Sequence, residues 1–260
     1  IYPVSSPKIE NATLLLKGDT IIAVGPSDQI DIPADAQRID ATGKTIIPGL
    51  ICTHSHIGSV SGADSSSPIQ PEVRVLDSID VRDTSINKAR AGGITTVNLM
   101  SGSGHLLSGQ TLYLKLREGN TVEDLSIKLP DGSLAYGVKM ANGTNSIRDN
   151  GPFPGTRAKS AALVRQKFLE AQVYQKKRAK HLEENDPEKI FERDLALETL
   201  ADILDGKRTV HHHTHRHDDI LTVLRLKEEF GFKVVLHHVS EAWKVADEIA
   251  AADVPCSLIF

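Results

Sequence analysis

Two histidines close an apolar run near the beginning of this sequence. The run over residues 48–52 is followed by His54 and His56, which are separated by one residue. Side chains alternate between the two faces of a β-strand, so both imidazoles are expected to point the same way. Two imidazoles on one face can share a metal ion, and the pair therefore predicts part of a metal site.

Three later strand-like runs also end in residues that suit such a site. Lys139 stands near the end of the run 134–140, His213 ends the run 208–213, and His238 ends the run 233–238. Active sites of parallel barrels lie at the carboxyl ends of the strands, where these side chains would meet.

Lys139 needs a special chemical state in a site of this kind. If it faces inward, so do the small residues Gly137 and Ala135, which leave room for a metal. An ammonium group buried among metal ions would be desolvated and repelled. The amine is therefore either deprotonated or converted by carbon dioxide to a carbamate, an anion that can bridge two metals.

Strand alternation also sorts the other histidines. In the run 208–213 and the loop after it, the inward set is His211, His213 and His215, and His212 points outward. If His238 faces inward, Val234 and Leu236 accompany it, and His237 packs outward against helices. For His211, His212 and His237 a core role is the more common one, and the tract 211–217 is also typical of an adventitious metal binder.

The elements that would position these residues alternate between strand and helix. Further strands are predicted over 94–100, 110–116 and 254–259, and helices over 158–184, 187–204, 219–230 and 240–252. Repeated strand–helix units predict an α/β fold with a parallel sheet, and their number favours a TIM-type (β/α)8 barrel. An open doubly wound sheet is the alternative, although no Gly-x-Gly-x-x-Gly motif opens a helix.

Residues 1–45 predict a separate small β unit, and residues 46–260 the barrel. Strands over 13–16 and 20–25 would form a hairpin, followed by a short third strand over 37–39. The Gly- and Ser-rich stretch 58–71 is interpreted as a long loop at the mouth of the site.

Composition favours small-molecule chemistry. The chain of 260 residues has a net charge of -4, 40% hydrophobic and 25% charged residues, so nothing suggests nucleic acid or an anionic membrane as partner. Two distant cysteines exclude a disulfide framework, and no apolar run is long enough for a membrane span. A cytoplasmic location is expected, with a removed signal segment before Ile1 and a homo-oligomer left open. The charged stretch 166–193 is interpreted as a solvated helical face.

The ordered set of motifs resembles the amidohydrolase superfamily, and within it the imidazolonepropionase-like metal-dependent hydrolases. The resemblance is carried by residues 41–44, 48–51, 54–56, 91–97, 136–140, 213–215 and 236–238. It implies a (β/α)8 barrel with a small β-sandwich to which residues 1–45 contribute, and one or two divalent metal ions, most often zinc. By position, His54 and His56 would hold one metal and His213 and His238 the other, with carbamylated Lys139 between them.

The resemblance also implies a reaction. In this family a hydroxide activated by the metal attacks a carbonyl carbon, and an aspartate at the end of the eighth strand handles the proton. Metal binding lowers the pKa of water and polarises the carbonyl, which agrees with that chemistry. We therefore expect hydrolysis of a C–N bond in a cyclic amide or dipeptide-like substrate.

Two departures from the family pattern favour an alternative. Cys52 stands where the family usually has Asp, one layer deeper than the histidine pair, and the run 254–259 is only the seventh strand. We expect the sequence to be an incomplete record of a longer protein that continues with strand eight. The alternative is a catalytically impaired barrel that acts as a binding or scaffold protein, and a third hypothesis is metal buffering by residues 211–217.

The substrate is left open between imidazolone, hydantoin-like rings and Xaa-Pro dipeptides. His105, His215 and Arg216 are the candidates for lining the mouth of the site, and Arg216 would suit a carboxylate. Arg216 fits equally well as a residue that begins a helix beside Asp218 and Asp219.

Overall fold

A computed structural model describes residues 1–60, 62–186 and 188–259. The chain forms two compact units, Ile1–Leu50 and Ile51–Phe260, whereas the sequence predicted a boundary after residue 45. The predicted helix start at Pro187, Ser61 of the predicted loop 58–71 and Phe260 lie outside the described residues.

The first unit contains the predicted hairpin. Strands β1 (Ala12–Lys17) and β2 (Thr20–Pro26) pair antiparallel, and the turn between them uses Gly18 with a φ of 61°. The predicted third strand over 37–39 is wrong, because these residues have no regular structure and Ile39 is 85% exposed. A strand without a partner leaves its backbone groups to water, and Pro33 also interrupts the approach to this segment.

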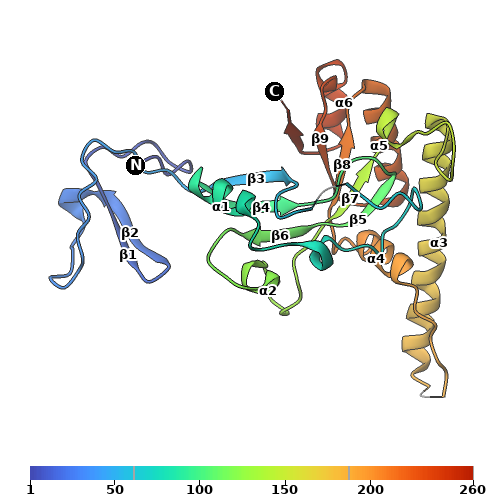
Figure 1. The fold of residues 1–260 in the computed structure, drawn as a ribbon, viewed down its shortest axis with the longest axis horizontal. Helices are drawn as coiled ribbons and strands as arrows, with labels where there is room; N and C mark the ends of the chain where they lie inside the picture. The colour runs from blue at the N-terminus through green and yellow to red at the C-terminus, as the bar shows by residue number, and fades with distance from the viewer. Residues whose placement is uncertain (61, 187, 260) are drawn as a thin grey trace. The chain divides into compact units, whose positions relative to one another are not determined.

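The second unit is an α/β structure with two sheets (Figure 1). The five-stranded sheet has the order β10 (Cys256–Leu258), β9 (Val234–His238), β8 (Val210–Thr214), β7 (Val138–Ala141) and β5 (Leu107–Gln110). The three-stranded sheet has the order β3 (Leu50–Ser55), β4 (Ile94–Leu99) and β6 (Leu112–Lys115). Strands β7 to β10 are parallel, as predicted.

The predicted strand 110–116 breaks the parallel pattern. Strand β5 pairs antiparallel with β7, and β6 pairs antiparallel with β4. Parallel neighbours need a crossover of about a dozen or more residues. The connection between the neighbours β4 and β6 contains β5 and no crossover helix, and the two strands pair antiparallel.

The two sheets of this unit are connected and curved. The Thr111 N–H donates to the Gly137 carbonyl at 2.8 Å, which joins the β5–β6 segment to the approach to β7. β3 is the end strand of one sheet and β10 the end strand of the other. The hydroxyls of Thr53 on β3 and Ser257 on β10 lie 2.6 Å apart. The strands therefore curl so that the first and last of them meet.

Helices cover the outer faces of these sheets. On the five-stranded sheet lie α3 (Arg157–Glu184), α4 (Leu195–Leu204) and α5 (His217–Phe230), and Phe168, Leu200 and Val223 pack there against Val210 and Leu236. On the other sheet lie the short α1 (Thr84–Ala91) and α2 (Val122–Leu125).

Two predicted helices are shorter than expected. Helix α4 begins at Leu195 because Asp194 caps it, accepting a hydrogen bond from the Leu197 N–H at 2.9 Å. The predicted helix 240–252 is divided into a 3-10 turn, Ala242–Lys244, and α6 (Ala246–Ala251). The helices predicted over 158–184 and 219–230 are confirmed by α3 and α5.

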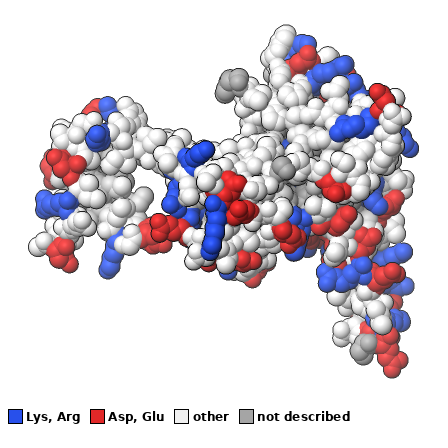
Figure 2. Space-filling model, in the orientation of Figure 1, with Lys and Arg blue, Asp and Glu red and all other residues white. Residues whose placement is uncertain are grey.

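The charged stretch is a solvated helical face, as predicted. Figure 2 shows both signs of charge interspersed over the protruding end of α3. Several of them pair locally, as Lys180 does with Glu184 and Arg178 with Asp205. Among the described residues, no helix combines the length and apolar character needed to cross a bilayer.

Candidate metal centre

The site begins with the histidine pair at the end of β3. His54 Nε2 and His56 Nε2 lie 3.2 Å apart. His56 Nδ1 is 2.6 Å from the Met100 carbonyl oxygen, which can only accept, so Nδ1 carries the proton and donates. In neutral His56, Nε2 therefore presents a lone pair toward His54.

Lys139 reaches the same point from β7. Its side chain is fully buried, and Nζ lies 3.3 Å from His54 Nε2 and 3.4 Å from Met100 Sδ. Burial lowers the pKa of Lys139 to about 7. The surroundings therefore disfavour the ammonium form, and the contact with His54 together with the burial shows that Lys139 faces inward.

His213 and His238 stand beside the pair. The His238 ring lies 4.7 Å from the His54 ring and 4.5 Å from the His213 ring, centroid to centroid. His213 Nε2 accepts a hydrogen bond from Asn145 Nδ2 at 2.9 Å, while its Nδ1 is buried without a partner among the described residues. The five residues predicted as ligands are thus brought together.

The predicted parity of β9 is wrong. His237 is fully buried and faces inward, where its Nδ1 lies 3.2 Å from His54 Nδ1, whereas Val234 and Leu236 pack in the core under the helices. His238 reaches the site because its φ of 72° takes it out of the strand conformation. A residue in the left-handed region no longer follows the alternation, which explains how neighbours 237 and 238 both turn inward.

His211 and His237 form a chain of contacts that the sequence did not predict. His211 Nδ1 lies 3.0 Å from His237 Nε2, and the Tyr113 hydroxyl lies 2.8 Å from His211 Nε2. His211 faces inward and His212 outward, as predicted, since His212 lines a small cavity with residues of α3 and α5. Tyr113 comes from the antiparallel segment, and only the strand pairing reveals that it belongs here.

These imidazoles are neutral over the physiological range. Burial lowers the pKa of His54 and His213 to about 2, of His237 to about 3, and of His211 and His238 to about 4. The nearby Lys139, when charged, contributes to each of these lowered values. Neutral imidazole is the form that binds metal ions.

The donor set fits a divalent metal in type and protonation. Ligand nitrogens about 2.1 Å from a tetrahedral zinc ion are about 3.4 Å apart, close to the 3.2 Å between His54 Nε2 and His56 Nε2. His56 presents its Nε2 lone pair across this distance, and the His54 tautomer with its proton on Nδ1 would present a second one. No set of three or more His, Cys, Asp or Glu side chains in the described part of the chain is arranged around one point.

The three residues predicted at the mouth have different surroundings. The His215 ring stacks on His238 with centroids 5.3 Å apart. His105 is 3% exposed and packs against Phe153, and neither of its ring nitrogens has a partner within the described residues. Arg216 immediately precedes α5, and its guanidinium binds both carboxylate oxygens of Asp218, at 2.8 and 3.0 Å. A substrate carboxylate would have to displace Asp218.

Cys52 is partly buried on the same strand as the histidine pair. Its thiol donates to the carbonyl oxygen of His54 at 3.2 Å. The thiol therefore forms a hydrogen bond with the backbone of β3, at the position where the resemblance implies a carboxylate.

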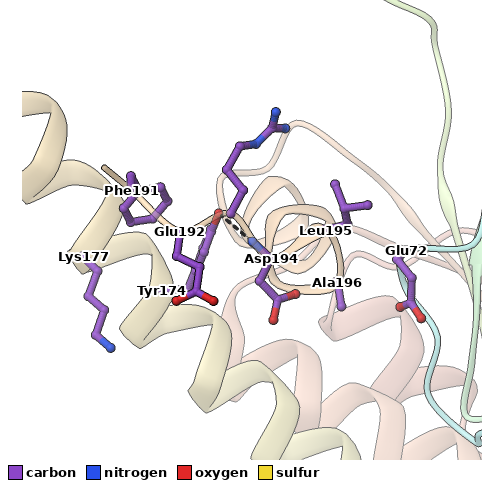
Figure 3. A pocket seen from close by; sticks show the side chains of 9 residues that line it. Glu72, Tyr174, Lys177, Phe191, Glu192, Asp194, Leu195 and Ala196 are labelled. Carbon is purple, nitrogen blue, oxygen red and sulfur yellow. Dashed lines mark hydrogen bonds between the residues drawn. The ribbon is translucent and has the colours of Figure 1, made fainter. Parts of the chain in front are cut away.

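A separate open pocket lies on the surface (Figure 3). It is formed by α3 and the segment before α4, and Tyr174, Phe191 and Asp194 are among the residues that line it. Its exposed, mixed-charge lining includes none of the predicted site residues, and we assign no function to it.

These observations define the class of the protein. It is an α/β protein that carries imidazoles and a buried lysine at the ends of its strands. The solved structure of an amidohydrolase from Thermotoga maritima MSB8 is 32% identical, with a TM-score of 0.86 over 99% of this chain and 67% of its own. The chain belongs to the amidohydrolase superfamily and is imidazolonepropionase-like.

Proteins with similar sequences also carry amidohydrolase-type names. Amidohydrolase tasK of Hapsidospora irregularis is 26% identical over 262 residues, 88% of this chain, and an imidazolonepropionase of Geobacillus kaustophilus is 46% identical over 54 residues, 19% of this chain. The chain spans 27% and 13% of the length of these two relatives. No protein-family model matches the chain.

Proposed function

We propose that this chain carries the metal-binding part of an amidohydrolase that cleaves a C–N bond in a cyclic amide or dipeptide-like substrate. The observation that carries the proposal is the approach of His56 Nε2 and Lys139 Nζ to His54 Nε2, at 3.2 and 3.3 Å. Membership of the superfamily supports it, as do relatives named imidazolonepropionase and enamidase.

Each residue has a proposed role. His54 and His56 hold one divalent metal ion, and His213 and His238 a second, with zinc favoured by neutral imidazoles. When bound, the metal supplies an activated water and polarises the scissile carbonyl. His213 gives up its hydrogen bond from Asn145 when it acts as a ligand through Nε2.

Lys139 is the proposed bridge. The uncharged amine, favoured by the lowered pKa of about 7, attacks carbon dioxide to form an N–C bond and loses a proton. The resulting carbamate is an anion that offsets the charge of two cations. Conversion to a carbamate also removes the repulsion that a buried ammonium would experience beside them.

Substrate contacts are proposed at the mouth. His215 stacks on His238, and the loop that carries His105 packs against Phe153 in the loop after β7. Arg216 is the proposed carboxylate partner if Asp218 is displaced. Imidazolone, hydantoin-like rings and Xaa-Pro dipeptides are the substrates to compare first.

Metal analysis and a substrate screen test the proposal. We expect one to two equivalents of a zinc-like metal, and Lys139→Ala is expected to abolish turnover. Lys180→Ala, which changes a lysine 76% exposed on α3, is the matched control and should leave turnover intact. Full turnover by Lys139→Ala would eliminate the bridging role.

Metal-binding variants separate the rival functions. Removing both His54 and His56 should abolish stoichiometric zinc binding. Tight binding that survives in that double variant would support metal buffering by residues 211–217. Zinc binding without hydrolysis of any amide tested would support a binding or scaffold protein.

A further inference from the structure

A series of four groups in contact leads inward from the candidate metal centre. His54 Nδ1 lies 3.2 Å from His237 Nδ1, His237 Nε2 lies 3.0 Å from His211 Nδ1, and His211 Nε2 lies 2.8 Å from the Tyr113 hydroxyl. The exposed fractions of His237 and His211 are 0% and 6%. Both are therefore sequestered behind His54 rather than available to a substrate.

The hydrogen bonds of this series can point in only two directions. A neutral imidazole carries one N–H and one lone pair, so each contact needs a donor on one side and an acceptor on the other. Either every proton points from His54 toward Tyr113, or every proton points from Tyr113 toward His54. The second direction places the His54 proton on Nε2, where no metal can then bind.

Metal binding at His54 Nε2 requires the first direction. His56 Nδ1 donates to the Met100 carbonyl, so His56 already presents its lone pair at the metal position. The proposed metal needs the Nε2 lone pairs of both His54 and His56, which lie 3.2 Å apart. With Nε2 as a metal ligand, the His54 proton is on Nδ1 and points at His237.

We propose that His237 is a positioning residue that accepts the His54 Nδ1 proton and so holds Nε2 ready for the metal, with His211 and Tyr113 fixing the tautomer of His237. The inference rests on the proposed function, because it concerns the same metal position. It gives His237 the task that carboxylates and carbonyls perform behind other metal-binding histidines.

The segment beside His211 leaves space for this series of hydrogen bonds. A Cβ at Gly137 on the approach to β7 would lie 2.5 Å from His211 Cδ2 and 2.8 Å from His211 Nε2. The absence of a side chain at 137 thus leaves space for the ring in the orientation that reaches both Tyr113 and His237. A His211 ring that only filled apolar space would not need this orientation.

Two substitutions at one position separate the two hydrogen bonds. In His237→Asn the amide oxygen can replace Nδ1 and accept from His54, whereas in His237→Gln the amide reaches the position of Nε2 and serves His211. We expect zinc affinity, measured by competition with a chromophoric chelator, to fall roughly 10- to 100-fold in His237→Gln. His237→Asn should retain affinity closer to that of the parent chain.

Tyr113→Phe tests the inner end while every imidazole stays in place. It leaves the His211 N–H without an acceptor, and zinc affinity should fall roughly tenfold. Thermal unfolding of the metal-free variants accompanies each titration, so that a loss of folding is distinguished from a loss of affinity. Equal zinc affinity in folded Tyr113→Phe and the parent chain would overturn the role of Tyr113.

Nitrogen-15 NMR of the zinc-loaded chain with labelled histidine reads the tautomers directly. We expect protons on His54 Nδ1 and His237 Nε2, and a proton on His237 Nδ1 would overturn the inference. Zinc binding by His237→Gln equal to that of His237→Asn would also overturn it while leaving the proposed function standing. Failure of the parent chain to bind zinc would overturn both.

Discussion

The chemistry of this site depends on which nitrogen of each imidazole carries the proton. Burial keeps the rings neutral, and the Met100 carbonyl assigns the proton of His56 to Nδ1. Lys139 is held in the same enclosure with its pKa lowered to about 7. Burial therefore disfavours the protonated form of both the lysine and the imidazoles.

Gly137 offers a test at the residue scale. The Gly137→Ala substitution should push the His211 ring out of its position, because the added Cβ would lie 2.5 Å from Cδ2. We expect a destabilisation of about 1–3 kcal/mol, measured by denaturant unfolding. Gly62→Ala is the control, since a Cβ there meets no atom within 4 Å among the described residues. Equal stability of the two variants would contradict the close packing described for His211.

At the scale of elements, the start of α4 depends on one cap. Asp194→Ala should cost about 1 kcal/mol of unfolding free energy, because the Leu197 N–H loses its acceptor. Asp194→Asn keeps a side-chain oxygen at this position and should be nearly neutral. Chemical denaturation of the two variants side by side measures the difference, and an equal loss in both would argue against a capping role.

An ion pair joins the starts of α3 and α5. Arg157 Nε lies 3.0 Å from the Asp219 carboxylate, and the side chains are 34% and 6% exposed. Arg157→Met should cost about 3 kcal/mol because it leaves a buried carboxylate unpaired. Asp219→Asn should cost less, since the freed guanidinium can reach water. Calorimetric unfolding of both variants checks the order, and the reverse order would show that the carboxylate is not the constrained partner.

The elements were predictable to different degrees. Periodicity located α3 and α5 and the parallel strands β7 to β9, because each has a distinct pattern and a clear boundary. It failed for the N-terminal part of the helix predicted over 187–204. The composition there is typical of a helix, but α4 begins only after its cap, Asp194. It also could not give the direction of β5, which shows only in its antiparallel pairing with β7.

The site was predictable as a set of residues and less so as an arrangement. Strand-end position and alternation identified His54, His56, Lys139 and His213, and the structure brings them together. The exchange of roles between His237 and His238 was not predictable, because a single positive φ cancels the alternation on which the prediction depended. Tyr113 carries no local signal at all, since its contact with His211 arises from pairing across the sheet.

At the scale of the whole molecule, the buried histidines connect stability to pH in the metal-free protein. Their pKa values of about 2 to 4 in the folded state lie below the ordinary 6.5. Below about pH 6.5 the unfolded chain binds more protons than the folded one, so stability falls as the pH decreases from 6.5 toward 4. Lys139 acts in the same sense between its folded pKa of about 7 and the ordinary 10.5, where stability rises with pH.

We therefore expect the metal-free chain to unfold at a lower temperature at pH 5 than at pH 7.5. Thermal scans in the presence of a chelator measure this, and addition of zinc at pH 7.5 should raise the midpoint because it binds only the folded state. A midpoint that stays constant between pH 5 and pH 7.5 would contradict the burial of neutral histidines.

The turn that ends β9 has an energetic consequence. His238 and Val239 both have positive φ values, 72° and 42°, where a non-glycine residue carries a cost of about 1–2 kcal/mol. Glycine at position 238 would relieve that strain but could present no imidazole to His54 and His213. Stability and the proposed ligand role thus oppose each other at this turn: His238→Gly should raise the free energy of unfolding in a denaturant titration and weaken zinc binding.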